Sequence, residues 1–231
     1  QRDIGLDASF LKNRLNISMD YFSKETNDVI LARNLPKYDG GYRIMQNIGQ
    51  VDNKGFEFSA DYQVLNKSGL EWNVGFNIST VKNEVVNLGD ETRIFGGVYG
   101  SGLLPTNCFV IEPGHPLGSF WGVKSLGLWG ANEAAEALKY GAQPGDTKYE
   151  DLNGDFVINN SDYQITGDAN PDYTFGINNT ISYKNFTFNL LVEGVQGRDV
   201  LNVMYGIAAL PVGDSRSITL KEGADIWTTS N

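Results

Sequence analysis

The chain has 231 residues and a formal net charge of −10, because 18 Lys and Arg residues face 28 Asp and Glu residues. Nucleic-acid binding needs clustered cations, and the sequence has no stripe of Lys and Arg, so nucleic acid is not an expected partner. One cysteine, Cys108, and one histidine, His115, exclude a disulfide framework, a catalytic triad and a multi-histidine metal site within this chain.

The first expected element is a β-hairpin. Residues 4–10 and 15–21 alternate apolar and polar side chains, and residues 12–14 supply a short turn between them. A long irregular stretch is expected to follow, at about 23–54.

A second hairpin is predicted at residues 55–80, where the alternation is cleanest, with a turn at 66–69. Its apolar positions are Phe56, Phe58, Ala60, Tyr62, Val64, Leu70, Trp72, Val74, Phe76 and Ile78. Because successive side chains of a strand point to opposite faces, this pattern predicts a sheet with one aromatic-rich apolar face and one polar face. A lipid-facing surface and a water-filled lumen have these two compositions.

Two more hairpins are expected further along the chain. After a long stretch at about 82–106, residues 109–129 are predicted to form two strands around a tight turn at 113–116. A third long segment, 130–171, precedes the sharply alternating residues 173–192.

The segment 130–171 contains the one helix signal. Asn132 is a plausible N-cap, acidic residues follow it, and Gly141 can take the left-handed conformation at the C-terminal end. We expect a short surface helix with no catalytic role.

Short turns and long connections alternate along the whole chain. In an antiparallel sheet this places every short turn at one end and every long connection at the other, as in outer-membrane barrels. The sequence therefore predicts an all-β fold, an antiparallel up-and-down transmembrane β-barrel segment with long external loops and about eight strands. No run of about 18 apolar residues could form a spanning helix, but barrel strands need only about 9–11 residues each. Both ends look like cuts, so residues 1–231 are expected to be part of a larger barrel.

The segment Asp151–Asp162 has the spacing of a calcium-binding loop. Ca²⁺ takes about six to eight oxygen ligands, which such loops supply from alternate positions. The expected ligands are the side chains of Asp151, Asn153, Asp155 and Asp162 and the carbonyl of Val157, with Asn159 acting through water. The ion would have a structural role, stabilising an external loop.

Two residues depart from the usual calcium loop. Phe156 stands at the sixth position, where glycine normally provides a positive φ, and a bulky residue there costs about 1–2 kcal/mol. Asp162, at the twelfth position, has a short arm and could bind through one oxygen only. The alternative is a polar turn whose carboxylates accept hydrogen bonds from nearby backbone N–H groups.

Four aromatic residues could stack on sugar rings, or could instead form an interfacial belt or pin a loop. They are Trp121, Trp129, Tyr140 and Tyr149. Asp61 and Glu71 could be read as a carboxylate pair, but isolated charges are ordinary on a polar strand face. Since no nucleophile–base pair is visible, no enzyme activity is expected.

Several segments, in the same order, resemble the SusC/RagA family of TonB-dependent outer-membrane transporters of Bacteroidetes. They are Asp20–Phe22, Thr26–Asp28, Asn47–Glu57, Pro113–Gly122, Pro144–Tyr149 with the Asp151 loop, Gly194–Asp199 and Trp227. The resemblance covers nearly the whole chain. It implies that Pro113–Gly122 is a periplasmic turn with its following strand, and that Pro144–Tyr149 enters an Asp-rich external loop.

The resemblance implies a barrel of about 22 strands with a plugged lumen, of which this chain is a C-terminal portion. Such transporters lie in the outer membrane, in contact with its lipid, and take up oligosaccharides or peptides. They are driven by an inner-membrane TonB complex, which contacts an N-terminal part that this sequence lacks. They usually work with a SusD-like surface lipoprotein that closes over the external loops.

The competing hypothesis is a secreted, calcium-stabilised β module that binds glycans through its aromatic residues. A barrel segment should need detergent or self-associate, because its strand edges and lipid-facing aromatic band are exposed. A secreted module should be monomeric in plain buffer, with those aromatic residues buried between two packed sheets.

Overall fold

The computed structural model describes residues 1–34, 43–96 and 107–202. By its internal contacts the chain divides into two compact units. The first consists of Gln1–Ile94, Ile111–Gly118 and Asp168–Asp199, and the second of Phe95–Val110, Ser119–Gly167 and Val200–Asn231. Trp227, which contributes to the family resemblance, lies outside the described residues.

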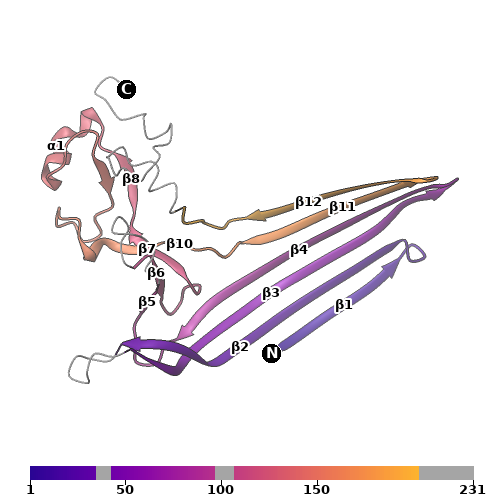
Figure 1. Ribbon diagram of the computed structural model, residues 1–231, viewed down its shortest axis with the longest axis horizontal. Helices are drawn as coiled ribbons and strands as arrows, with labels where there is room; N and C mark the ends of the chain where they lie inside the picture. Colours follow the sequence, from indigo (N-terminus) through magenta and orange to yellow (C-terminus); the bar gives the residue numbers. More distant parts are fainter. Residues whose placement is uncertain (35–42, 97–106, 203–231) are drawn as a thin grey trace, which may run out of the picture. The chain divides into compact units, whose positions relative to one another are not determined.

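The first unit is built on one sheet of six strands in the order β1-β2-β3-β4-β11-β12 (Figure 1). The strands are β1 (Arg2–Phe10), β2 (Leu15–Asn34), β3 (Arg43–Lys67), β4 (Leu70–Asn87), β11 (Tyr173–Tyr183) and β12 (Phe186–Gln196). Every neighbouring pair is antiparallel. The predicted all-β, antiparallel up-and-down fold is therefore confirmed.

Short turns join the strands at one end of this sheet. Residues 11–14 link β1 to β2, residues 68–69 link β3 to β4, and residues 184–185 link β11 to β12. Ser68 and Gly69 have φ values of 56° and 77°, as a type I′ hairpin turn requires. The connections from β2 to β3 and from β4 to β11 leave from the opposite end, which confirms the predicted sorting for the six strands of this sheet.

The stretch 23–54, expected to be irregular, is mostly strand. β2 and β3 stay paired through it as far as Asn34 and Arg43, with bulges near Thr26 and Val29. Polar residues occupy both faces along much of this stretch, so hydrophobic alternation gave no signal there. The backbone ladder continues regardless, because it does not depend on side-chain polarity.

Residues 109–129 do not add a hairpin to the main sheet. β6 (Phe109–Ile111) and β7 (Ser119–Val123) belong to a separate sheet, so the main sheet has six strands within the described residues rather than about eight. The turn between them packs on the end of β4 that is remote from the short turns. There the Gly114 N–H donates to the Val85 carbonyl (2.8 Å) and the Val85 N–H donates to the His115 carbonyl (2.9 Å). The implied placement of this turn among the short, periplasmic turns is therefore wrong.

The buried core of the first unit lies at the same end of the sheet. It consists of Val51, Val85, Leu88 and Ile94, with Val29, Leu31 and Ile111 packed against it. Leu88 and Ile94 follow β4 in the chain, so the connection that leaves β4 folds back onto the sheet and covers it.

The second unit contains the sheet β10-β7-β6-β5 and the strand pair β8-β9. The remaining bounds are β5 (Ile94–Gly96), β8 (Ser125–Leu128), β9 (Thr147–Tyr149), β10 (Tyr163–Gly167), η2 (Ala131–Glu133), η3 (Leu138–Tyr140) and η4 (Asn160–Asp162).

The predicted short helix is confirmed as α1 (Ala134–Ala137), and Gly141 takes the left-handed conformation after it, with a φ of 66°. Asn132 is not the cap, because it lies inside η2; the Glu133 carboxylate accepts the Gly130 N–H at 3.0 Å instead. None of the helices in the described part of the chain has the length and hydropathy to cross a membrane.

The position of the buried core predicts that substitutions at two nearby residues will change the free energy of unfolding by different amounts. Leu88 is 1% exposed, so Leu88→Ala should lower the free energy of unfolding by about 2–5 kcal/mol through lost burial and a residual cavity. Val86 is 42% exposed, so Val86→Ala, the control, should change it by less than about 0.5 kcal/mol. Urea unfolding of the full-length protein measures both, and equal effects would contradict the placement of the core.

Candidate functional site

The main sheet has an apolar band on one face in the half nearer its short turns. One cross-strand row of this band consists of Leu6, Met19, Phe58, Ile78 and Phe175. The band is not covered by a second sheet within the described residues: Ile4 is 73% exposed and Phe188 is 60% exposed. This exposure contradicts the alternative of a secreted module that buries these side chains between packed sheets.

One amide interrupts the apolar band without being left unpaired. The side-chain oxygen of Asn179 on β11 accepts a hydrogen bond from Trp72 Nε1 on β4 at 3.0 Å. An unsatisfied amide would be costly in an apolar environment. The contact therefore lets Asn179 lie in the band.

The opposite face of the same strands is polar. Asp61 lies there opposite Gly75, and Glu71 lies there opposite Asn66. Gly75 and Glu71 are four positions apart on β4, so the two carboxylates are separated by about 13 Å along the strand. They form no close pair of the kind that acid–base catalysis requires.

The chemistry of the two faces reverses toward the long connections. Phe56 belongs to the apolar band and pairs with Thr80 of β4, but Lys54 and Lys82 occupy the next positions beyond this pair on the same face. On the other face, apolar Val51 and Val85 are buried in the core. Sequence reasoning missed this reversal, although its signal is readable: the apolar residues of β3 and β4 change from even to odd numbers.

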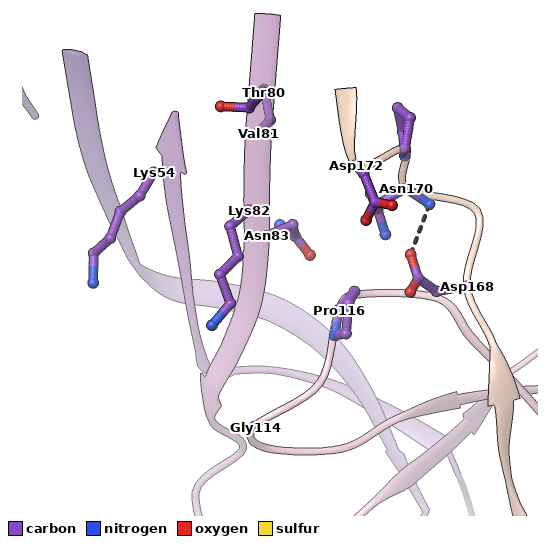
Figure 2. A pocket seen from close by; sticks show the side chains of 11 residues that line it. Lys54, Thr80, Val81, Lys82, Asn83, Gly114, Pro116, Asp168, Asn170 and Asp172 are labelled. Carbon is purple, nitrogen blue, oxygen red and sulfur yellow. Dashed lines mark hydrogen bonds between the residues drawn. The ribbon is translucent and has the colours of Figure 1, made fainter. Parts of the chain in front are cut away.

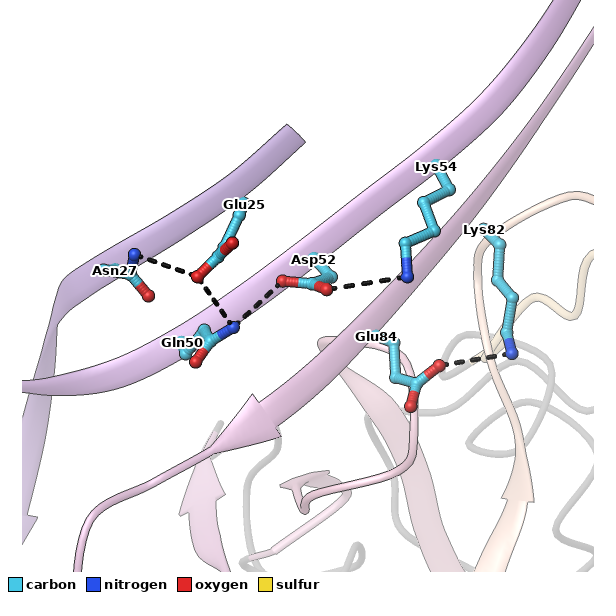
Figure 3. Close-up of polar contacts among 7 residues, drawn as sticks. All are labelled: Glu25, Asn27, Gln50, Asp52, Lys54, Lys82 and Glu84. Carbon is cyan, nitrogen blue, oxygen red and sulfur yellow. Dashed lines mark hydrogen bonds and ion pairs between the residues drawn. The ribbon is translucent and has the colours of Figure 1, made fainter. Parts of the chain in front are cut away.

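Polar side chains form a connected group beyond the band, shown in Figure 3. Gln50 Nε2 donates to Glu25 and to Asp52, each at 3.3 Å. An ion pair continues the group, with Lys54 Nζ 3.7 Å from Asp52, and a separate ion pair lies on β4, with Lys82 Nζ 3.2 Å from Glu84. Lys54 and Lys82 thus contact carboxylates on their own strands.

An open pocket of about 260 Å³ lies beside β4, just beyond its last pair with β11 (Figure 2). Its walls include Lys82 and Asn83 of β4 and Pro116 of the turn. Asp168 and residues 170–172, which precede β11, also line it. Asn83 is fully engaged: its Nδ2 donates to Asn53 at 2.8 Å and its Oδ1 accepts the Leu117 N–H at 2.7 Å. The pocket marks where β4 and β11 diverge, and lysines and carboxylates line it together.

The Asp151–Asp162 segment folds as a closed polar loop in the second unit. The Asp151 carboxylate accepts the N–H groups of Gly154 (2.7 Å) and Phe156 (2.9 Å). Burial alone would raise the pKa of Asp151, but these backbone donors lower it below its ordinary value. Phe156 has a φ of 63°, so it takes the conformation that glycine usually provides at the sixth position of a calcium loop.

Asp162 closes this loop from the inside. Its side chain is 0% exposed, and its two oxygens accept the N–H groups of Leu152 (3.0 Å) and Asn159 (2.8 Å). Asp155 likewise accepts the Val157 N–H at 2.8 Å, which fits the polar-turn alternative. No three His, Cys, Asp or Glu side chains gather as a metal site in the ranges that the structure describes. The donor set is nevertheless oxygen throughout, which is the ligand chemistry that Ca²⁺ prefers.

Trp129 and Tyr140 pin this loop to the helical turns rather than facing solvent. Trp129 is 4% exposed, with the Tyr140 ring 5.5 Å away and Lys148 Nζ 4.4 Å from its ring centre. Tyr140 also packs on Phe156 at 5.4 Å. Desolvation, followed by the negative charge of Asp151, raises the pKa of Tyr140. These contacts fit the loop-pinning alternative.

The other two candidate aromatic residues lie in the small sheets. Trp121 is half-buried between Phe95 and Tyr163, at ring distances of 5.7 and 6.2 Å. Tyr149 is 40% exposed. The structure therefore does not gather the four aromatic residues into one sugar-stacking surface.

Comparisons with known proteins agree with this architecture. The family described as "TonB dependent receptor-like, beta-barrel" matches residues 1–195. TonB-dependent receptor P3 of Formosa agariphila is 33% identical over 100% of this chain and 23% of its own length. TonB-dependent receptor SusC of Bacteroides thetaiotaomicron is 25% identical over 80% of this chain and 18% of its own length. The chain thus spans about a quarter or less of these relatives.

A solved structure has the same fold. A chain of "Structure of the RagAB peptide transporter" gives a TM-score of 0.68 at 19% identity, over 90% of this chain and 22% of that chain. The family match, the curated relatives and the two-faced sheet confirm the resemblance inferred from the sequence: the chain belongs to the TonB-dependent receptor-like β-barrel family.

Proposed function

We propose that this chain forms a sector of the barrel wall of an outer-membrane, TonB-dependent importer that takes up oligosaccharides or peptides. One observation carries the proposal: the sheet has an apolar outer band and a polar inner face, and its long connections all leave from one end. A wall between lipid and water needs this division, because lipid accepts apolar side chains and a lumen accepts polar ones.

In this mechanism the polar face lines the path of the substrate. Carboxylates and amides such as Asp61, Asn73 and Asn77 would offer hydrogen bonds to hydroxyl or peptide groups passing beside them. The long connections at the outer rim would contact the substrate and a SusD-like lipoprotein that closes over them. The TonB complex would act on a part of the receptor outside this chain, which spans about a quarter of its relatives.

A matched pair of arginine substitutions tests the orientation of the wall. Ala60 lies in the apolar band and Ser59 lies beside it on the polar face. Ala60→Arg should destabilise the full-length receptor in lipid vesicles by about 2–4 kcal/mol, since a guanidinium near the bilayer centre is poorly solvated. Ser59→Arg should cost much less. Urea titration in vesicles measures both, and an equal or reversed order would contradict the proposal.

An uptake measurement tests transport itself. Cells that produce the full-length receptor should accumulate a labelled oligosaccharide or peptide, whereas cells without the receptor or without TonB should not, because opening a plugged lumen requires energy. Equal accumulation with and without the receptor would contradict import.

The SusD-like partner is tested separately by deleting its gene, which should lower uptake.

We also propose that the loop Asp151–Asp162 binds Ca²⁺ through Asp151, Asn153, Asp155, Val157 and Asp162. Support comes from the spacing of these oxygens and from the positive φ of Phe156, which gives the sixth position the backbone conformation that a calcium loop needs in spite of the bulky side chain. The ion would be structural, holding the polar loop against the aromatic pair Trp129 and Tyr140.

Chelation tests the calcium proposal. Saturating Ca²⁺ at about a hundred times its dissociation constant should stabilise the folded loop by about 2.7 kcal/mol relative to chelator. The shift should appear in thermal melting followed by tryptophan fluorescence, because Trp129 packs beside the loop. The control is Asp151→Asn combined with Asp155→Asn, which should abolish the shift. A midpoint that chelator leaves unchanged would contradict calcium binding.

A further inference from the structure

The charged side chains beyond the apolar band are sorted into two rows by their distance from it. The first row is formed by Arg2, Ser23, Lys54 and Lys82, which pair in this order across β1 to β4. The second row is formed by Glu25, Asp52 and Glu84, which pair in this order two positions further along β2 to β4. Each row therefore carries a single sign of charge.

Sorting by sign is unfavourable for the sheet itself. Side chains directly opposite each other have Cβ atoms about 4.5–5.5 Å apart, and like charges there are destabilising. Lys54 faces Lys82 in this way, and Asp52 faces Glu84. Alternating signs across the strands would have formed ion pairs without this repulsion. The arrangement therefore fits a partner whose own charge is layered along the same direction.

The lysine row lies where such a layer begins. It follows the row containing Tyr21 and Phe56, the last of the apolar band, by two residues on each strand. With a rise of about 3.3 Å per residue and a strand tilt of about 40°, the row stands about 5 Å beyond the band. The polar headgroups of a bilayer begin just outside its hydrocarbon core, at this height. The side chains of Lys54 and Lys82 are 55% and 79% exposed, so both ammonium groups can reach outward despite their ion pairs.

We propose that Lys54 and Lys82, with Arg2 two strands away in the same row, bind the phosphate groups of lipids in the outer leaflet. This inference rests on the membrane location in the proposed function. Each ammonium group has three N–H donors, enough to keep its carboxylate and to add a phosphate oxygen. Glu25, Asp52 and Glu84 repel an anion at their own height, so they set the outer limit of the phosphate layer.

The test compares lipid binding by variants of the full-length receptor in neutral detergent. The probe is dioleoyl phosphatidic acid, and dioleoylglycerol, which lacks the phosphate, is the reference lipid. Native mass spectrometry gives the affinity for each lipid. Lys54→Gln with Lys82→Gln should weaken phosphatidic acid binding on the order of 30-fold and leave dioleoylglycerol binding unchanged.

Two controls make the result specific. Lys124→Gln with Lys139→Gln removes two lysines of the second unit that are also in ion pairs and are 54% and 52% exposed, close to the exposure of Lys54. This variant should bind phosphatidic acid as the unchanged receptor does. Lys54→Arg with Lys82→Arg keeps both charges and should retain binding, which also shows that the positions tolerate substitution.

Three results would overturn the proposal. The first is an unchanged affinity for phosphatidic acid in the Lys54 and Lys82 glutamine variant. The second is an equal loss of that affinity in the Lys124 and Lys139 control. The third is that the Lys54 and Lys82 glutamine variant no longer captures the SusD-like lipoprotein but still binds phosphatidic acid. The last result would assign the two rows to a protein interface. A receptor that inserts and transports normally but shows one of these results refutes the lipid site alone, whereas a failure of the Ala60→Arg test refutes the membrane wall.

Discussion

The alternation of side chains along a β-strand is the constraint on which this structure depends. A residue's number decides its face, so a strand whose two ends meet different surroundings cannot keep one pattern along its whole length. Its backbone register is fixed by the ladder: β3 and β4 stay paired from Lys67↔Leu70 to Gln50↔Asn87. The alternation of apolar and polar residues therefore shifts by one position along these strands, while the pairing of the strands stays the same. Phe56 and Ile78 are apolar on the outer face, and Val51 and Val85 are apolar on the inner one.

Because apolar residues change to the inner face near the end of β4, the connection that follows β4 has buried side chains to cover. Buried apolar residues on the inner face need a cover, and Leu88, Ile94 and Ile111 provide it. The same connection also occupies part of the free edge of β4, which extends eight residues beyond its last pair with β11 at Ser79. The turn at 113–116 exchanges backbone hydrogen bonds with Val85, so this stretch of edge is not left open for another strand.

Sequence patterns predicted the elements whose environment is uniform. Residues 55–80 and 173–192 have an apolar side and a polar side throughout, and their strands were found where the alternation placed them. Residues 23–54 carry polar side chains on both faces along much of their length, so the periodic signal is weak and the strand was missed. Residues 109–129 alternate locally, but alternation alone does not say which sheet a strand joins.

The candidate site shows the same limit. The spacing from Asp151 to Asp162 predicted a calcium-binding loop, and Phe156 has the positive φ that such a loop needs at its sixth position. The sequence did not show that Asp162 would be fully buried or that Trp129 would be covered by Tyr140 and Lys148. Both facts arise from tertiary packing between segments that are 10 or more positions apart in the chain.

The two outermost strands of the main sheet, β1 and β12, each have one edge without a partner strand within the described residues. On β12, Phe186 is 79% exposed, whereas Ile181 on the neighbouring strand β11 is 36% exposed, because β12 has a neighbour on one side only within the described residues. In lipid, each unpaired backbone N–H or C=O on such an edge costs several kcal/mol, so an open sheet does not persist there. Six strands are about a quarter of a barrel of about 22, similar to the 23% of the relatives' length that this chain spans. The sheet can therefore stand in a bilayer only when strands beyond the described residues pair with β1 and β12 and close the barrel.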